Sequence, residues 1–131
     1  MSGPVANECD PAGPMPFLLI HGTNDPFFPA RGGGPRDLLT TVDAVAFWRV
    51  HNECGETPTT STLLDPVNDG TSVNVHQYQD CANGAEVEYY EVEGGGHTWP
   101  NPVLTFPPSS GLKTEDMDAA AAIGVFFLRH G

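Results

Sequence analysis

Apolar runs and periodic apolar positions divide the first half of the chain into a strand-like and a helix-like segment. Residues 17–21 (FLLIH) form a short apolar run that ends at Gly22, as expected for a strand buried on both faces of a parallel sheet. From about Thr40 to Gly55, apolar residues recur at helical spacing, and Thr40 with Asp43 predicts a capping pair at the helix start. The pattern therefore predicts a strand, a polar loop and a helix that packs on the sheet.

The second half begins with an irregular stretch and ends in a helix. Residues 56–70 are rich in Thr, Pro, Asp and Gly and are predicted to be irregular. Residues 71–78 and 85–92 are β-prone and are separated by turn-forming residues, which predicts a hairpin or two neighbouring strands. Residues 115–130 are expected to form a helix, since acidic residues lie near its start and basic residues near its end.

This order of elements predicts an α/β fold with three or four strands, of which two are expected to run parallel. Residues 1–15 are interpreted as an irregular lead-in, and residues 16–131 as the folded part. A parallel sheet needs both faces covered, and so thin a sheet leaves an edge that another segment should occupy. The pattern therefore indicates part of a larger α/β domain.

Charge and hydropathy exclude two classes of partner. The 131-residue chain has 17 acidic and 5 basic residues, which gives a net charge of -12 at pH 7. Such a charge repels phosphate backbones and anionic lipid surfaces. The chain also lacks an apolar run long enough to span a bilayer. Neither nucleic acid nor a membrane is expected as a partner.

Candidate chemistry lies in two loops that each follow a predicted strand and that carry Asp25 and His97. A histidine acts well as a general base when a carboxylate accepts its other ring N–H. The three glycines at 94–96 would let the backbone turn sharply and carry the imidazole over the sheet edge. Taken alone, an Asp before a Pro is also a common turn starter, and a His after glycines an ordinary loop residue.

The three cysteines allow two interpretations, which depend on the compartment. A bridge between Cys54 and Cys81 would leave Cys9 to pair with upstream sequence in an oxidising compartment, whereas in the cytosol all three would be thiols. His21 is expected to be a hydrogen-bonded packing residue at a strand end.

A metal site is not expected. Asp65, Asn68 and Asp69 match a calcium loop only in part, because Val67 and His76 occupy positions where ligands are needed, so a turn is predicted there.

Two segments carry a family resemblance. Residues 19–29 (LIHGTNDPFFP) and 87–100 (VEYYEVEGGGHTWP) resemble the acid and base loops of the polyhydroxyalkanoate (PHB) depolymerase and feruloyl esterase group of α/β-hydrolases. The GGGHTWP motif directly after a strand is the more specific of the two. The resemblance covers nearly the whole chain after residue 15 and implies the C-terminal strands and helices of a three-layer α/β-hydrolase fold.

The resemblance also implies roles for individual residues. Asp25 matches the triad acid, His97 the general base, and Trp99 a residue that lines the substrate pocket, while Cys54 and Cys81 match a disulfide pair. It further implies hydrolysis of a carboxylic ester (a polyhydroxyalkanoate, feruloyl or acetyl ester) without a metal or organic cofactor, in an extracellular or periplasmic location.

The chain departs from the family in the pocket and in the nucleophile. Phe28 and Ala30 replace the residue types usual at those positions, so the resemblance does not define the substrate pocket. No serine stands in a GxSxG context, so the chain alone is predicted to be inactive and to need the missing N-terminal part of the hydrolase domain. The alternative is a non-catalytic remnant or interaction module of the same fold.

Overall fold

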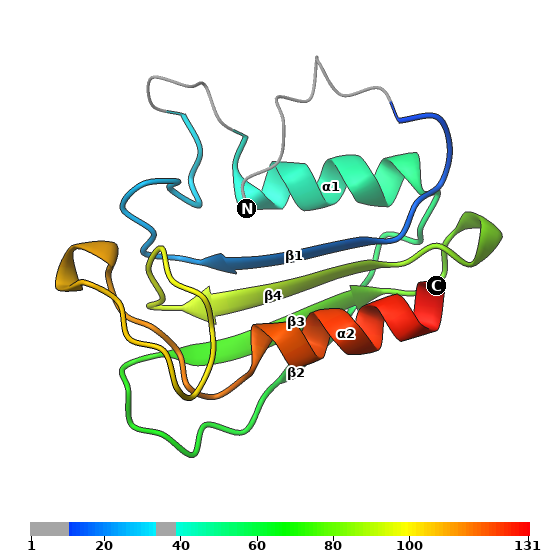
Figure 1. Cartoon of the computed structure of the whole chain (residues 1–131). Helices are drawn as coiled ribbons and strands as arrows, with labels where there is room; N and C mark the ends of the chain where they lie inside the picture. The colour runs from blue at the N-terminus through cyan, green and yellow to red at the C-terminus, as the bar shows by residue number, and fades with distance from the viewer. Residues whose placement is uncertain (1–10, 34–38) are drawn as a thin grey trace.

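The computed structural model describes residues 11–33 and 39–131. Within them the chain forms four strands, two α-helices and two short 3₁₀ turns (Figure 1). In chain order these elements are β1 (Phe17–Gly22), α1 (Thr41–His51), β2 (Thr59–Thr62), β3 (Ser72–Tyr78), η2 (Ala82–Gly84), β4 (Val87–Glu93), η3 (Pro108–Ser110) and α2 (Ala119–His130).

The four strands form one mixed sheet in the order β1-β4-β3-β2. β1 and β4 are parallel and paired from Phe17 with Val87 to Gly22 with Val92, whereas β3 is antiparallel to both β4 and β2. The expected α/β class, the parallel pair and the neighbouring strands 71–78 and 85–92 are therefore present. Because β1 and β4 are parallel, the loops that follow them leave from the same edge of the sheet.

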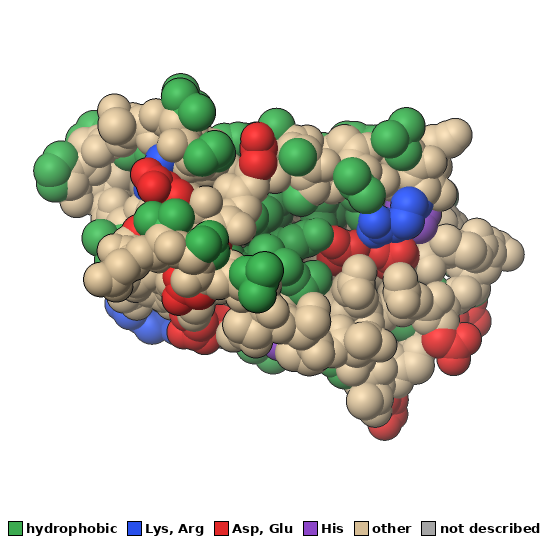
Figure 2. Space-filling model, turned by 90° about the horizontal axis from the view of Figure 1, so that it is seen from below, with side chains coloured by type: hydrophobic (Ala, Val, Ile, Leu, Met, Phe, Trp, Pro, Cys, Tyr) green, Lys and Arg blue, Asp and Glu red, His purple; other side chains and the backbone are tan. Residues whose placement is uncertain are grey.

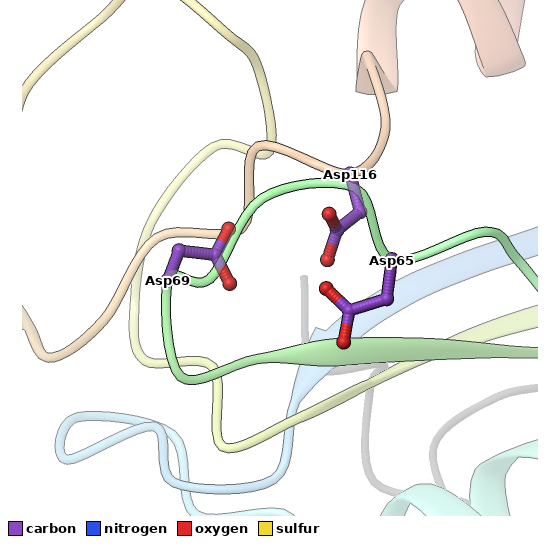
Figure 3. Close-up of side chains that lie close together, drawn as sticks. All are labelled: Asp65, Asp69 and Asp116. Carbon is purple, nitrogen blue, oxygen red and sulfur yellow. The ribbon is translucent and has the colours of Figure 1, made fainter.

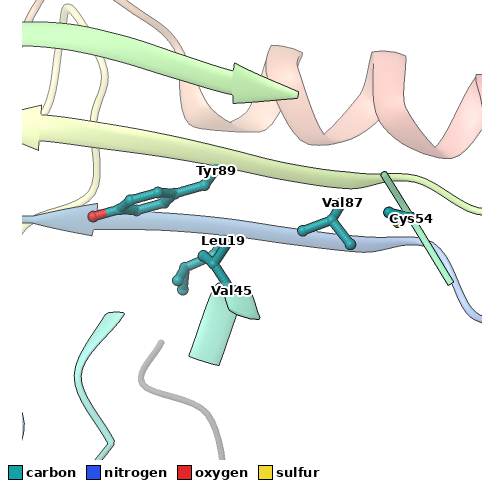
Figure 4. Close-up of a cluster of buried hydrophobic side chains, with 5 residues drawn as sticks. All are labelled: Leu19, Val45, Cys54, Val87 and Tyr89. Carbon is teal, nitrogen blue, oxygen red and sulfur yellow. The ribbon is translucent and has the colours of Figure 1, made fainter. Parts of the chain in front are cut away.

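Helix α1 covers one face of the sheet. Val45 of α1 packs there against Leu19 of β1 and against Val87 and Tyr89 of β4 (Figure 4). Val87 is fully buried, and burying a side chain of that size stabilises the fold by roughly 1.5–3 kcal/mol.

The opposite face carries the second core cluster. Strand residues alternate between the two faces, so Val92 of β4 points away from Val87 and packs with Val73 and Val75 of β3. Met117 and Ala119, at the start of α2, close this cluster. One helix thus lies on each face of the sheet.

Each helix differs from the sequence-based expectation at one boundary. The Thr40 hydroxyl accepts a hydrogen bond from the Asp43 amide, as the capping pair predicted, but α1 ends at His51 rather than near Gly55. Helix α2 begins at Ala119 and not at residue 115, because the Asp118 carboxylate caps the amides of the first turn.

The stretch 56–70, predicted to be irregular, contains the short edge strand β2. Its four residues, TTST, are all exposed. The hydrophobic pattern carries no signal for such a strand, since neither of its faces is buried, and only the β-propensity of threonine favours it. The prediction of an irregular segment was wrong at these four positions.

Cys54 and Cys81 form a disulfide, which joins the end of α1 to the turn before β4. Cys9, and the first ten residues of the lead-in, lie outside the described residues. The disulfide is consistent with an extracellular location. None of the helices described is long and apolar enough to cross a membrane.

Two surfaces of the molecule are left without a cover among the described residues. β1 pairs only with β4, so its other edge has no strand beside it. Helix α2 exposes Val125, Phe127 and Leu128, with Leu128 87% exposed. Figure 2 shows hydrophobic side chains gathered across the middle of one face of the molecule. An unpaired strand edge and an exposed apolar helix face are each typical of a fold that packs against a further segment.

Candidate functional site

The loops after β1 and β4 lie side by side at one edge of the sheet. The Thr23 amide donates to the Val92 carbonyl and the Asn24 amide to the Gly95 carbonyl, so the pairing of β1 with β4 continues beyond both strands. The Gly94 amide in turn donates to the Thr23 hydroxyl. These three bonds hold the acid loop and the base loop together.

Asp25 and His97, the two residues singled out from the sequence, meet at this edge. The His97 Nδ1 atom lies 2.9 Å from the Asp25 Oδ2 atom. The other carboxylate oxygen, Oδ1, accepts hydrogen bonds from the backbone amides of Phe27 and Phe28, each 2.8 Å long. The Asp25 side chain is 5% exposed, so both oxygens are fixed inside the loop.

Hydrogen bonds keep the Asp25 carboxyl in its charged form. Burial by itself raises its pKa, but the bonds from the Phe28 amide, the His97 ring and the Phe27 amide outweigh that effect and hold the pKa below its ordinary value. A carboxylate that stays charged can orient an imidazole and stabilise the imidazolium that forms during proton transfer.

The His97 ring is buried on one side and open on the other. Its side chain is 49% exposed, and Nε2 has no hydrogen-bond partner among the residues that the structure describes. The rings of Phe27 and Phe28 lie against it, each with a centroid distance of 5.3 Å. Nε2 is therefore available to a group that approaches from outside these residues.

Two glycines shape the base loop. Gly94 has a φ of 77°, which an L side chain rarely adopts, and so provides the sharp turn expected from the sequence. Gly96 packs so tightly on the end of η3 that an added Cβ would lie 2.1 Å from the Ser110 carbonyl oxygen. The His97 amide donates to that same oxygen over 2.7 Å, which fixes where the histidine side chain leaves the backbone.

A groove of about 250 Å³ lies beside the acid loop and is lined by Thr23, Asp25, Pro29 and Arg31, among others. Trp99, which the resemblance places in the substrate pocket, does not line this groove. Its side chain is 46% exposed and makes no ring contact with His97 or any other described residue. Its role in substrate binding stays a prediction.

Three aspartates form a second cluster of polar residues. Carboxylate oxygens of Asp65, Asp69 and Asp116 lie within 4.8 Å of one another (Figure 3). The Asp69 carboxylate already accepts bonds from the Thr71 amide and hydroxyl and from the Glu115 amide. Burial and the charge of Asp69 raise the pKa of Asp116. The sequence predicted Asp116 within a helix and gave no sign of this proximity. Hydrogen bonds from the Glu115 amide to Asp69 and from the Val67 amide to Asp116 join the two loops and account for it.

His21 is a third residue at this site, which the sequence predicted only as a packing residue. Its buried ring lies 3.4 Å from the Asp25 Oδ2 atom, and its Nε2 atom lies 2.7 Å from the Phe28 carbonyl oxygen. The expectation of a hydrogen-bonded packing residue holds, but the contact with Asp25 was not foreseen. The contact depends on how the 25–28 turn folds back over the end of β1, which no local sequence pattern marks.

Comparison with curated proteins finds a protein named "Putative esterase NocK" from Nocardia uniformis subsp. tsuyamanensis. It is 28% identical over 140 residues, which cover 95% of this chain but 40% of that protein. The chain therefore spans less than half the length of this relative. No protein-family model matches the chain, and no solved structure matches it. The comparison supports an esterase-like sequence and does not extend to a particular esterase family.

Proposed function

We propose that this chain supplies the acid and the base of a serine-type carboxylic-ester hydrolase, and that the attacking serine belongs to a further part of the hydrolase domain. The observation that carries the proposal is the 2.9 Å contact between buried Asp25 and half-exposed His97, whose Nε2 atom remains unpaired among the described residues. Similarity to a longer esterase-like protein supports it.

The proposed reaction uses His97 twice. Nε2 removes the proton of the serine hydroxyl while the serine oxygen attacks the ester carbonyl, and the Asp25 carboxylate stabilises the imidazolium. His97 then gives that proton to the departing alcohol as the C–O bond breaks. A water molecule repeats the same steps on the acyl-enzyme and releases the carboxylic acid.

The uncovered surfaces support a larger domain. The free edge of β1 and the exposed apolar residues of α2 are the places where further strands and helices would pack. In this proposal the missing N-terminal part of the domain is the partner. The ester classes suggested by the sequence resemblance are hydroxyalkanoate oligomers, feruloyl sugars and acetylated polysaccharides, and the proposed location is extracellular or periplasmic.

Hydrolysis of a short-chain p-nitrophenyl ester tests this function. The 131-residue chain and a longer protein, extended by the coding sequence that precedes it in its gene, are compared with their His97→Ala variants. The chain alone should show no hydrolysis above its variant. The longer protein should be active and should lose at least about a thousandfold of kcat in the variant, as expected when a triad base is removed.

His76→Gln is the matched control, because His76 also lies 3.4 Å from a carboxylate, that of Glu91, but within β3, opposite Tyr89 and not in the site loops. It should leave the activity unchanged. Hydrolysis by the short chain that depends on His97 would contradict the proposal, because a residue within the chain would then be the nucleophile. An inactive longer protein would favour the non-catalytic alternative.

A further inference from the structure

His21 is the second histidine at the Asp25 carboxylate and is not part of the proton transfer described above. It lies on β1 next to Gly22, and its side chain is 5% exposed. Its Nε2 atom lies 2.7 Å from the Phe28 carbonyl oxygen and 3.4 Å from the Asp25 Oδ2 atom. One ring nitrogen thus faces both ends of the turn that carries the acid.

The hydrogen-bond chemistry of these contacts fixes the tautomer. A carbonyl oxygen only accepts hydrogen bonds, so Nε2 must carry the proton that Phe28 binds. The other nitrogen, Nδ1, is buried and has no partner among the described residues. A charged ring would leave an unpaired N–H there, which is costly away from water. Burial accordingly lowers the pKa of His21, and the ring is neutral.

We propose that His21 is a positioning residue for the catalytic acid, which holds the 25–28 turn against β1 through its Nε2–H group so that the Asp25 Oδ2 atom stays directed at His97. This inference rests on the proposed function, because it assigns a role in the same site. The backbone amides of Phe27 and Phe28 fix the Asp25 Oδ1 atom from the side of the loop. His21 fixes the loop from the side of the strand.

Neutrality matters to this role. A cationic ring at 3.4 Å would compete with His97 for the negative charge of Asp25 and weaken its hold on the imidazolium. A neutral N–H bound mainly to a carbonyl orients the turn and leaves the carboxylate charge for His97. The buried environment of β1 is what makes a neutral histidine suitable here.

The test reads the ring nitrogens directly in the 131-residue chain. Long-range ¹H–¹⁵N spectra at pH 7 report which nitrogen of each histidine carries a proton, and they do not require any hydrolysis. We expect His21 to be neutral with its proton on Nε2, and His97 to carry a proton on Nδ1. In His21→Leu, the fraction of His97 molecules without the Nδ1–H bond to Asp25 should rise about five- to tenfold, the factor that corresponds to one net hydrogen bond.

Two further variants separate positioning from folding. His21→Gln keeps an amide N–H that can reach the Phe28 carbonyl and should restore most of the His97 signal. His76→Leu removes a partly exposed histidine from another carboxylate and should leave that signal unchanged. A His21 that only fills space would lower the melting temperature in both His21 variants without moving the His97 nitrogens.

The outcomes distinguish the two proposals. If His97 shows the Nδ1–H form in the parent chain and keeps it in His21→Leu, the role of His21 is wrong and the Asp25–His97 pair stands. A His21 ring with its proton on Nδ1, or a charged one, also overturns the inference. If the parent chain lacks the Nδ1–H form of His97, both proposals fail, because there is then no oriented pair for His21 to support.

Discussion

The buried carboxylates at the two ends of the parallel pair β1–β4 have different partners. At the end where β4 begins, Glu86 and Glu88 are both bound by Arg129 of α2, over 2.8 and 2.6 Å. At the end where β4 stops, Asp25 is bound by His97, whose remaining nitrogen is open. A carboxylate that is closed off by a partner from a helix stabilises the fold, whereas one that ends in an open imidazole can do chemistry.

The end where β4 begins is also held by a disulfide on the face that α1 covers. The Cys54–Cys81 disulfide lies there, and Cys54 packs in the same cluster as Val87 (Figure 4). His130, the last residue of α2, places its Nε2 atom 3.3 Å from the Glu86 carboxylate. The disulfide and the ion pairs of Arg129 and His130 therefore lie at one end of the β1–β4 pair, and the candidate site lies at the other end.

Removal of the disulfide should have the largest effect on stability. Cys54 and Cys81 are 27 residues apart, and closing a loop of that size is worth about 3–4 kcal/mol of unfolding free energy. Urea unfolding of the Cys54→Ala/Cys81→Ala double variant measures the loss. The His97 nitrogens should not change, because the disulfide lies at the opposite edge, and a change there would contradict the separation of the two ends.

Arg129→Met should come next. The substitution leaves two nearly buried carboxylates without their cation, and breaking a buried ion pair costs about 3–5 kcal/mol. Because the Arg129 side chain is 37% exposed, we expect a smaller loss of roughly 2 kcal/mol in the same unfolding measurement. Arg49→Met, on the far helix α1, serves as the control and should be nearly neutral. Equal losses of unfolding free energy in the two variants would contradict a stabilising role of the Arg129–Glu86–Glu88 contacts.

Asp25→Ala should cost less, because the lost partners are two loop amides. The variant leaves the two amides unsatisfied and removes the bond to His97. Together these losses should lower the free energy of unfolding by about 1–2 kcal/mol. Asp25→Asn keeps an oxygen for those amides but loses the charge, so it should recover most of the stability and none of the orientation of His97. Equal stability of Asp25→Ala and the parent chain, by urea unfolding, would show that the amides do not depend on the carboxylate.

The pH dependence of stability should be the smallest effect, and it has opposite signs for Asp25 and Glu86. The folded-state pKa of Asp25 lies below its ordinary value of 3.8, so its contribution is complete above that value and is lost as the pH falls through the lower folded value. Burial and the neighbouring Glu88 raise the pKa of Glu86 above its ordinary value of 4.5, so stability declines as the pH rises from 4.5 through the folded value.

Unfolding midpoints measured across this acid range separate the two terms. Asp25→Asn should flatten the loss of stability at the acid end, and Glu86→Gln should flatten the decline on the other side. If each variant left the pH profile of the parent unchanged, the assignment of opposite pKa shifts to Asp25 and Glu86 would be wrong.

Much of the fold follows from local sequence. The apolar run at 17–21, the β-prone stretches and the Thr40 cap predicted β1, β3, β4 and the start of α1, because each signal lies within a few residues of its effect. β2 could not be predicted in this way, since an exposed edge strand has no buried face to mark in the sequence. The start of α2 was misplaced because several acidic residues competed for the cap and only Asp118 takes it.

The candidate site was predictable in part for the same reason. Asp25 and His97 follow predicted strands, and their contact follows once those strands are parallel neighbours. The ring of His21 at the carboxylate depends on how the turn folds back over the strand, and the proximity of Asp116 to Asp69 joins loops 47 positions apart in the sequence. Neither contact leaves a local pattern.

The most direct measurement of the central claim is the tautomer of His97 in Asp25→Asn compared with the parent chain, read from its ring nitrogens at neutral pH. We predict a proton on Nδ1 in the parent, with Nε2 left free to accept a proton, and a mixed or reversed tautomer in Asp25→Asn, where the asparagine side chain no longer offers a charged acceptor. A parent ring that carries its proton on Nε2, or a parent and variant with the same spectrum, would contradict the account, because Asp25 would then not orient His97 as a base.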